Sequence, residues 1–299
     1  MNMNFYECCN IRRFLRLLLL DAVIFAIFAA SFFVGRTILT AAGGSSGSQE
    51  KGIPLPAVMY HSVREGTPAE YSVTPQQLEA DLKELKRRGY TAVSAEELCL
   101  YAQGTGSLPE KPVLITFDDG FYNNLSEALP LLNKYDMCAV VSPVGAYCEV
   151  NAPLYPHDPD CSYLTWEDIR VLEASGRVEI GSHTYDMHSL TNGRRGCSKT
   201  DGESDEAYSA ALTEDIAAMQ MLVREQTGIQ PIVFAYPFGA ISPGNLPVLR
   251  EQGILLTLTC REEINYITRD PDCLYGIGRF NRSGYYSAEE FADMLENGE

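Results

Sequence analysis

The strongest structural signal in the chain is Val113-Leu114-Ile115-Thr116-Phe117-Asp118-Asp119-Gly120. An apolar run typical of a buried strand is followed directly by two carboxylates and a glycine. In α/β folds, chemically active side chains gather where parallel strands end. The sequence Asp-Asp-Gly is also common in ordinary turns, so this stretch alone does not indicate a functional site.

The second signal is a histidine-bearing cluster, Ser182-His183-Thr184-Tyr185-Asp186-Met187-His188, which follows the short apolar segment Val178 to Ile180. The chain has four histidines, and two of them lie in this cluster. One carboxylate and two imidazoles make a divalent-metal site, and a neighbouring carboxylate can act as the base toward water. Together the two clusters predict a metal-dependent hydrolase, although either one alone is weak.

These motifs resemble the polysaccharide deacetylases of the NodB-homology type, carbohydrate esterase family four. Thr116-Phe117-Asp118-Asp119-Gly120 matches the first motif of that family. The segment from His183 to His188 is similar to the second motif, with one more residue between the histidines than the commonest form. Phe234-Ala235-Tyr236-Pro237-Phe238-Gly239 resembles the third motif. Val58-Met59-Tyr60-His61-Ser62 is similar to the first strand of the branch that acts on exported poly-N-acetylglucosamine.

The resemblance assigns expected roles to individual residues. It implies that Asp119, His183 and His188 are the metal ligands and that Asp118 is the general base. It also implies that the backbone N–H of Phe238 stabilises the oxyanion of the tetrahedral intermediate. Two neutral imidazoles favour a first-row metal, so we expect Zn, with Co or Ni as alternatives.

Two departures from the family pattern concern the arginine that orients the base and the histidine that serves as general acid. The arginine position of the third motif is Ala235, and the histidine position of the fifth motif is Arg279. We expect Arg279 to orient Asp118 from the opposite side of the mouth. Arginine cannot deliver a proton near neutral pH, so His61, at the end of the first strand, or Asp118 itself after protonation becomes the expected donor.

Short apolar segments alternate with helical patterns, which indicates parallel strands joined by helices. The resemblance implies a distorted (β/α) barrel with about seven parallel strands and the motifs at one mouth. Expected strands are 55–60, 91–94, 113–117, 138–142, 178–181, 232–236, 255–259 and 275–279, and expected helices are 74–89, 95–101, 125–134 and 205–227. The polar insert 192–206 is expected to be a solvated loop.

The N-terminal region predicts a membrane anchor. Residues 17–36 are predominantly apolar, follow a cluster of arginines and as a helix would span about 27 Å or more, close to the hydrocarbon thickness of a bilayer. We therefore expect residues 1–16 to be cytoplasmic, 17–36 to be a transmembrane signal anchor, 37–53 a flexible linker and 54–299 the extracellular catalytic domain. Secretion after signal cleavage is the alternative.

The net charge limits the kinds of partner that we expect, and the cysteine content limits the disulfides that could form. The formal net charge of −17 argues against nucleic acid as a partner. Seven cysteines follow the predicted anchor, and the pairs Cys148–Cys161 and Cys260–Cys273, which each bracket a loop, are the expected disulfides. Buried thiols are the alternative.

The expected function is removal of N-acetyl groups from N-acetylglucosamine units of an extracellular or cell-wall polysaccharide. The expected partners are that polysaccharide and the membrane, through the N-terminal helix. An esterase acting on O-acetyl groups is an alternative, because an alkoxide leaves more easily than an amine and tolerates a missing acid better. A weakly active or inactive glycan-binding module is the third interpretation.

Overall fold

The computed structural model describes residues 52–155, 157–191 and 193–298. The predicted cytoplasmic segment 1–16, the predicted anchor 17–36 and all but the last two residues of the predicted linker 37–53 lie outside these ranges. Among the helices within the ranges, none combines the length and the apolar character needed to cross a bilayer.

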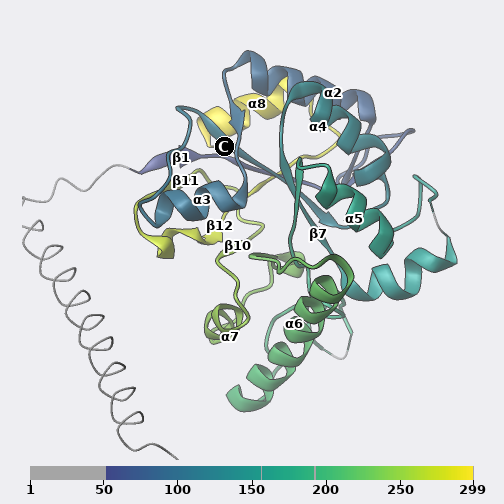
Figure 1. Cartoon of the computed structure of the whole chain (residues 1–299), viewed down its shortest axis with the longest axis vertical. Helices are drawn as coiled ribbons and strands as arrows, with labels where there is room; N and C mark the ends of the chain where they lie inside the picture. The colour runs from purple at the N-terminus through teal and green to yellow at the C-terminus, as the bar shows by residue number, and fades with distance from the viewer. Residues whose placement is uncertain (1–51, 156, 192, 299) are drawn as a thin grey trace, which may run out of the picture. The chain divides into compact units, whose positions relative to one another are not determined.

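Parallel strands form the centre of this part of the chain, with helices around them (Figure 1). Five strands form the path β13-β2-β6-β7-β8, in which every neighbouring pair is parallel, and β5 adds to β6. Their bounds are β2 (Ala57–Tyr60), β5 (Thr91–Ala92), β6 (Pro112–Asp119), β7 (Ala139–Pro143), β8 (Val178–Ile180) and β13 (Phe280–Asn281).

A second group of parallel strands, in the order β12-β10-β9, continues from the first. An isolated parallel bridge between Ser182 and Phe234 joins the chain after β8 to β9, and only Gly278 and Arg279 separate β12 from β13. The mixed α/β class with parallel strands is confirmed, and this circuit of pairings is consistent with the expected distorted barrel. The bounds are β9 (Val233–Ala235), β10 (Leu256–Leu258) and β12 (Tyr275–Ile277).

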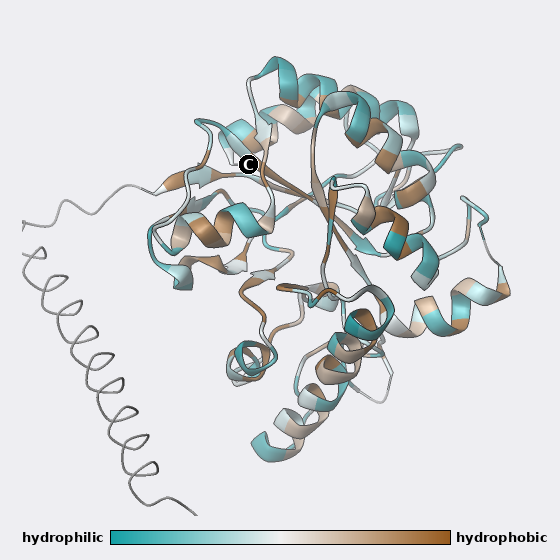
Figure 2. Cartoon of the chain, viewed as in Figure 1, coloured by the Kyte–Doolittle hydropathy of each residue, from teal (hydrophilic) through white to brown (hydrophobic). Residues whose placement is uncertain are grey.

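The helices pack their apolar faces on the strands and present polar residues outward, and Figure 2 shows brown strands enclosed by helices with teal outer faces. The sequence pattern predicted four of them, whereas α5, α7 and α8 were not expected. The bounds are α2 (Pro75–Arg87), α3 (Ala95–Ala102), a π-helix η1 (Asn124–Ala128) leading into α4 (Leu129–Tyr135), α5 (Trp166–Ala174), α6 (Asp205–Thr227), α7 (Asn245–Glu251) and α8 (Ala288–Asn297).

Local capping chemistry sets where several helices begin. Thr74, Ser94, Thr165 and Ser287 each form a reciprocal capping box with the residue three positions later. Each box satisfies two backbone N–H groups that would otherwise lack a partner.

Two short strand pairs lie outside the central circuit. The expected first strand 55–60 is divided at Pro56, which has no N–H to donate. Its first part, β1 (Ile53–Leu55), pairs antiparallel with β11 (Asn265–Ile267), and β3 (Ser62–Val63) pairs with β4 (Ser72–Val73).

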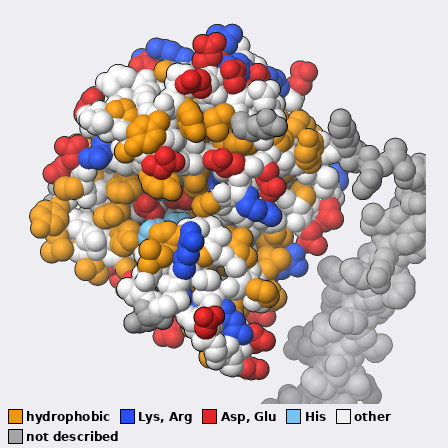
Figure 3. Space-filling view, turned by 180° about the vertical axis from the view of Figure 1, so that it is seen from behind, with side chains coloured by type: hydrophobic (Ala, Val, Ile, Leu, Met, Phe, Trp, Pro, Cys, Tyr) orange, Lys and Arg blue, Asp and Glu red, His pale blue; other side chains and the backbone are white. Residues whose placement is uncertain are grey.

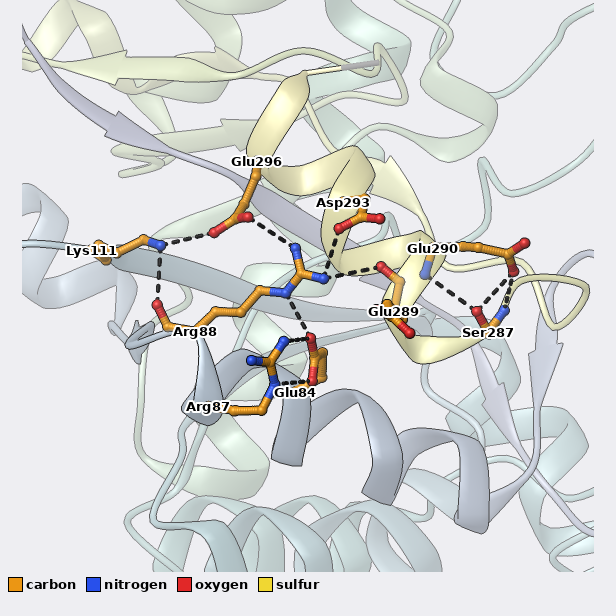
Figure 4. A network of polar contacts seen from close by, with 9 residues as sticks. All are labelled: Glu84, Arg87, Arg88, Lys111, Ser287, Glu289, Glu290, Asp293 and Glu296. Carbon is orange, nitrogen blue, oxygen red and sulfur yellow. Dashed lines mark hydrogen bonds and ion pairs between the residues drawn. The ribbon is translucent and has the colours of Figure 1, made fainter.

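Helices α2 and α8 are tied together by charged side chains, although they lie at opposite ends of the domain sequence. Arg88, the residue after α2, contacts Glu84 at 2.7 Å, Asp293 at 2.7 Å and Glu296 at 2.9 Å, and Lys111 reaches Glu296 at 2.9 Å (Figure 4). The Arg88 side chain is 9% exposed, but Asp293 and Glu296 are 58% and 38% exposed, so solvent screens these pairs much as it screens an ordinary surface pair.

The two expected disulfides are wrong. All seven cysteines in the described ranges are free thiols. Cys148 is buried in the apolar core whereas Cys161 is exposed. The Cys260 sulfur lies 3.8 Å from the sulfur of Met59, and the Cys273 sulfur lies against the backbone of Thr268. Bracketing a loop in sequence therefore does not bring the paired sulfur atoms together.

Candidate active site

The two aspartates stand at the end of β6, where the strand turns sharply. Asp119 has φ of 69° and Gly120 has φ of 72°, so two consecutive residues adopt left-handed backbone. A Cβ on Gly120 would lie 2.6 Å from Pro143, which explains the glycine of the motif. Non-glycine residues in this region are strained, and such strain concentrates at functional sites.

His183 and His188 follow β8 and approach the same carboxylate. Their Nε2 atoms lie 3.6 Å and 3.2 Å from Oδ1 of Asp119. Nδ1–H of His183 donates to the carbonyl of Ala235 at 2.8 Å, so the lone pair of this ring is at Nε2, facing Asp119. The hydroxyl of Tyr147 lies 3.0 Å from Nδ1 of His188, and this contact leaves Nε2 of the second ring facing Asp119.

The three side chains fit a divalent cation. One ligand atom from each of Asp119, His183 and His188 lies within 4.8 Å of the others. Oδ1 of Asp119 is buried without a hydrogen-bond partner among the described residues, and a cation would satisfy it. Burial raises the pKa of Asp119 to about 6 and lowers the pKa of His183 to about 4, so His183 is a neutral ligand at physiological pH.

Asp118 is held by Arg279, as expected from the sequence. Nη1 and Nη2 of Arg279 donate to Oδ1 and Oδ2 of Asp118, each at 2.7 Å, and both side chains are buried. Arg279 also donates to the carbonyl of Thr259 and the hydroxyl of Thr116. Burial raises the pKa of Asp118, but the charge and hydrogen bonds of Arg279 outweigh it and hold that pKa below its ordinary value. Asp118 is therefore ionised, as a general base must be.

His61 and Phe238 complete the set of expected site residues, and both line the same pocket as Asp118 and Asp119. Nδ1 of His61 is buried without a partner among the described residues, and burial lowers the pKa of this side chain. Phe238 has φ of 57°, and its ring centroid lies 4.5 Å from that of His188. The pocket has a volume of about 490 Å³, and Figure 3 shows histidine and acidic side chains at the floor of a hollow.

Some pocket residues were not singled out from the sequence. Tyr71 packs edge-on against His61 with ring centroids 4.9 Å apart, and Arg195 reaches the pocket from the polar insert. Neither residue belongs to a motif, so pattern reasoning had no signal for them. Trp166 packs against the apolar core, whereas the rings of Tyr147 and Tyr163 are tilted toward each other with centroids 4.5 Å apart, and Tyr147 also contacts His188.

The α/β domain brings together a carboxylate–dihistidine cluster and an adjacent, arginine-held carboxylate, the side chains that metal-assisted hydrolysis requires. Residues 105–256 match the model of the family described as polysaccharide deacetylase. The chain belongs to this family.

Two relatives and one solved structure extend the comparison. YxkH of Bacillus subtilis (strain 168) is 29% identical over 83% of this chain and 78% of its own length. The poly-beta-1,6-N-acetyl-D-glucosamine N-deacetylase of Escherichia coli (strain K12) is 26% identical over 80% of this chain, which spans only 38% of that relative. The structure of IcaB from Ammonifex degensii is 26% identical, with a TM-score of 0.66 over 82% of this chain and 98% of that chain.

Proposed function

We propose that this protein removes N-acetyl groups from N-acetylglucosamine units of an extracellular or cell-wall polysaccharide. One observation carries the proposal: a carboxylate held by Arg279 lies directly beside the cluster of Asp119, His183 and His188 in a single pocket. The name of the Escherichia coli relative, which specifies poly-beta-1,6-N-acetyl-D-glucosamine, supports this substrate class. The pocket lies at the ends of β6 and β8, the position expected for the mouth of a distorted barrel.

Each residue then has a defined part in the reaction. Asp119, His183 and His188 would hold a divalent metal, with Zn proposed, which supplies Lewis-acid polarisation of the acetamide carbonyl. Asp118 accepts a proton from the attacking water, and Arg279 fixes its orientation through two hydrogen bonds. The backbone N–H of Phe238 donates to the oxyanion that develops as the new C–O bond forms.

The second half of the reaction requires a proton donor. As the C–N bond breaks, the sugar nitrogen takes a proton and acetate is released. His61 in its imidazolium form is the proposed donor, because it lines the pocket and its ring nitrogen Nδ1 has no partner among the described residues. The proton that Asp118 takes from water restores the imidazolium after each turnover. Asp118, having taken the proton from water, is the alternative source.

We further propose that the catalytic domain acts outside the cell and is held at the membrane by residues 17–36. The apolar composition of this segment and the arginines before it support the proposal. Fractionation of cells, with mass measurement of the N-terminal peptide, tests it. Recovery of full-length protein in the membrane pellet is expected, whereas a soluble extracellular form that begins after residue 36 would contradict anchoring.

Acetate release from matched substrates tests the activity. Wild type with Zn should release acetate from β-1,6-linked N-acetylglucosamine oligomers, and Asp118→Asn should lose about 10²-fold or more of kcat. O-acetylated xylo-oligosaccharides serve as the comparison substrate. Release from the O-acetylated substrate alone would replace the N-deacetylase proposal with the esterase, and release from neither, with Zn bound, would favour a glycan-binding module.

A further inference from the structure

The polar insert after the second motif does not extend freely into solvent but packs on the turn that contains Phe238. Gly196, in this insert, has φ of 52°, and a Cβ added to it would lie 2.6 Å from the carbonyl oxygen of Pro237 and 3.3 Å from the Phe238 ring. The N–H of Gly196 donates to the carbonyl of Ser189 at 3.0 Å. This close backbone approach, which a larger residue would prevent, fixes the insert against the third motif.

Arg195, the residue before this contact, touches Phe238 in two ways. Its Nη2 donates to the backbone carbonyl of Phe238 at 3.3 Å, and its guanidinium lies 5.9 Å from the centroid of the Phe238 ring. Arg195 also lines the pocket together with His188 and Phe238. A single exposed side chain thus holds both the main chain and the side chain of Phe238.

Phe238 needs such support. Its φ of 57° is a left-handed conformation that aromatic residues rarely adopt, and it persists only where surrounding contacts determine it. Its neighbours Gly239 and Ala240 donate backbone hydrogen bonds to Tyr236 and Pro237. The N–H of Phe238 has no acceptor among the described residues, so the turn presents it as a free donor.

We propose that Arg195 is a positioning residue for the oxyanion donor. This role rests on the proposed function, because the N–H of Phe238 takes part in catalysis only if an oxyanion forms in the pocket. Arg195 holds the carbonyl and the ring of Phe238, and this keeps the N–H directed at the reacting carbonyl. The insert therefore contributes to catalysis through Phe238, without contacting the reacting atoms.

Substitution of Arg195 separates positioning from substrate binding. Arg195→Ala should lower kcat about tenfold while KM stays within about twofold, since a misdirected oxyanion donor weakens the transition state more than the ground state. Arg195→Lys, which keeps a cation and a donor, should recover part of the loss. Lys199→Ala is the matched control, because Lys199 lies on the same insert and pairs with Asp205 instead of Phe238.

A second readout does not depend on turnover. In metal-free protein, Arg195→Ala should increase hydrogen–deuterium exchange in a peptide covering residues 236–240, while the melting temperature remains that of wild type. An unchanged exchange rate with unchanged kcat would overturn the proposal, and so would a rise in KM at constant kcat, which would make Arg195 a substrate-binding residue. If wild type itself releases no acetate from any substrate, the proposed function fails, whereas an active wild type with an equally active Arg195→Ala contradicts this inference alone.

Discussion

At the scale of single residues, the site depends on an arginine that stands where the family pattern has a histidine. Arg279 is fully buried and gives its hydrogen bonds to Asp118, Thr116 and Thr259. The position of the usual orienting arginine, Ala235, instead contributes a carbonyl that fixes His183. Arg279 thus replaces the usual orienting arginine, because a guanidinium can hold the carboxylate from either side of the pocket, and proton donation is left to His61 or Asp118.

The pH dependence of kcat/KM should report the pairing of Asp118 with Arg279. Asp118 works as a base only when ionised, and Arg279 lowers its pKa while burial raises it. In Arg279→Met the lowering contribution is lost, so the pKa of Asp118 should rise and the acid limb of kcat/KM should move to higher pH. Arg279→Lys should move it less. Acid limbs that coincide in wild type and Arg279→Met would show that Asp118 is not the titrating base.

His61 gives a second prediction at this scale. His61→Ala should lower kcat about 10²-fold, because the leaving nitrogen loses its proton donor, and added imidazole should restore part of the rate. Steady-state acetate release with and without imidazole is the measurement. Turnover within a few fold of wild type would remove His61 from the mechanism and leave Asp118 as the donor.

At the scale of elements, a buried ion pair joins α2 to the chain after β13. Asp81 accepts from Nε and Nη2 of Arg282 at 2.8 Å and 2.9 Å, and from the hydroxyl of Tyr60 at 3.0 Å. All three residues are buried. Burial raises the pKa of Asp81 more than Arg282 lowers it, so desolvation offsets much of the attraction within the pair.

Replacing Asp81 alone should therefore lower the free energy of unfolding more than replacing Asp81, Arg282 and Tyr60 together. Asp81→Leu should lower the free energy of unfolding by about 3–5 kcal/mol, because Arg282 is left buried and unpaired. The triple variant Asp81→Leu, Arg282→Met, Tyr60→Phe should recover part of this loss. Urea unfolding measures both, with Asp160→Leu as an exposed control expected within about 0.5 kcal/mol of wild type. A triple variant no more stable than Asp81→Leu would contradict the argument.

At the scale of the whole molecule, metal binding should be linked to stability. A ligand that binds only the folded state stabilises it by about 2.7 kcal/mol at a hundredfold excess over Kd. We expect Zn to raise the melting temperature of wild type and to leave that of Asp119→Ala unchanged. Addition of EDTA should reverse the shift and abolish acetate release. Equal shifts in both proteins would place the metal elsewhere.

The sequence by itself indicated the chemistry wherever the signal was local. Three features can each be recognised from a stretch of about ten residues: the apolar strand before Asp118, the histidine cluster after Val178 and the helix start at Thr74-Pro75. Helix capping and strand burial depend on residues that are near neighbours in the sequence. The helices α5, α7 and α8 were missed. Length does not explain this, because α3 and α4, with 8 and 7 residues, were predicted. Helices α5 and α8 begin with the capping boxes Thr165–Asp168 and Ser287–Glu290, a local signal that could have indicated both.

Only the tertiary structure decided which distant residues meet. It shows the geometry of the Arg279–Asp118 pair across 161 residues, the contact of Tyr147 with His188, the approach of Arg195 to Phe238 and the separation of the expected disulfide partners. Spacing along the chain does not determine these contacts. They arise from how parallel strands align their ends at one pocket, which depends on the packing of all the helices around them.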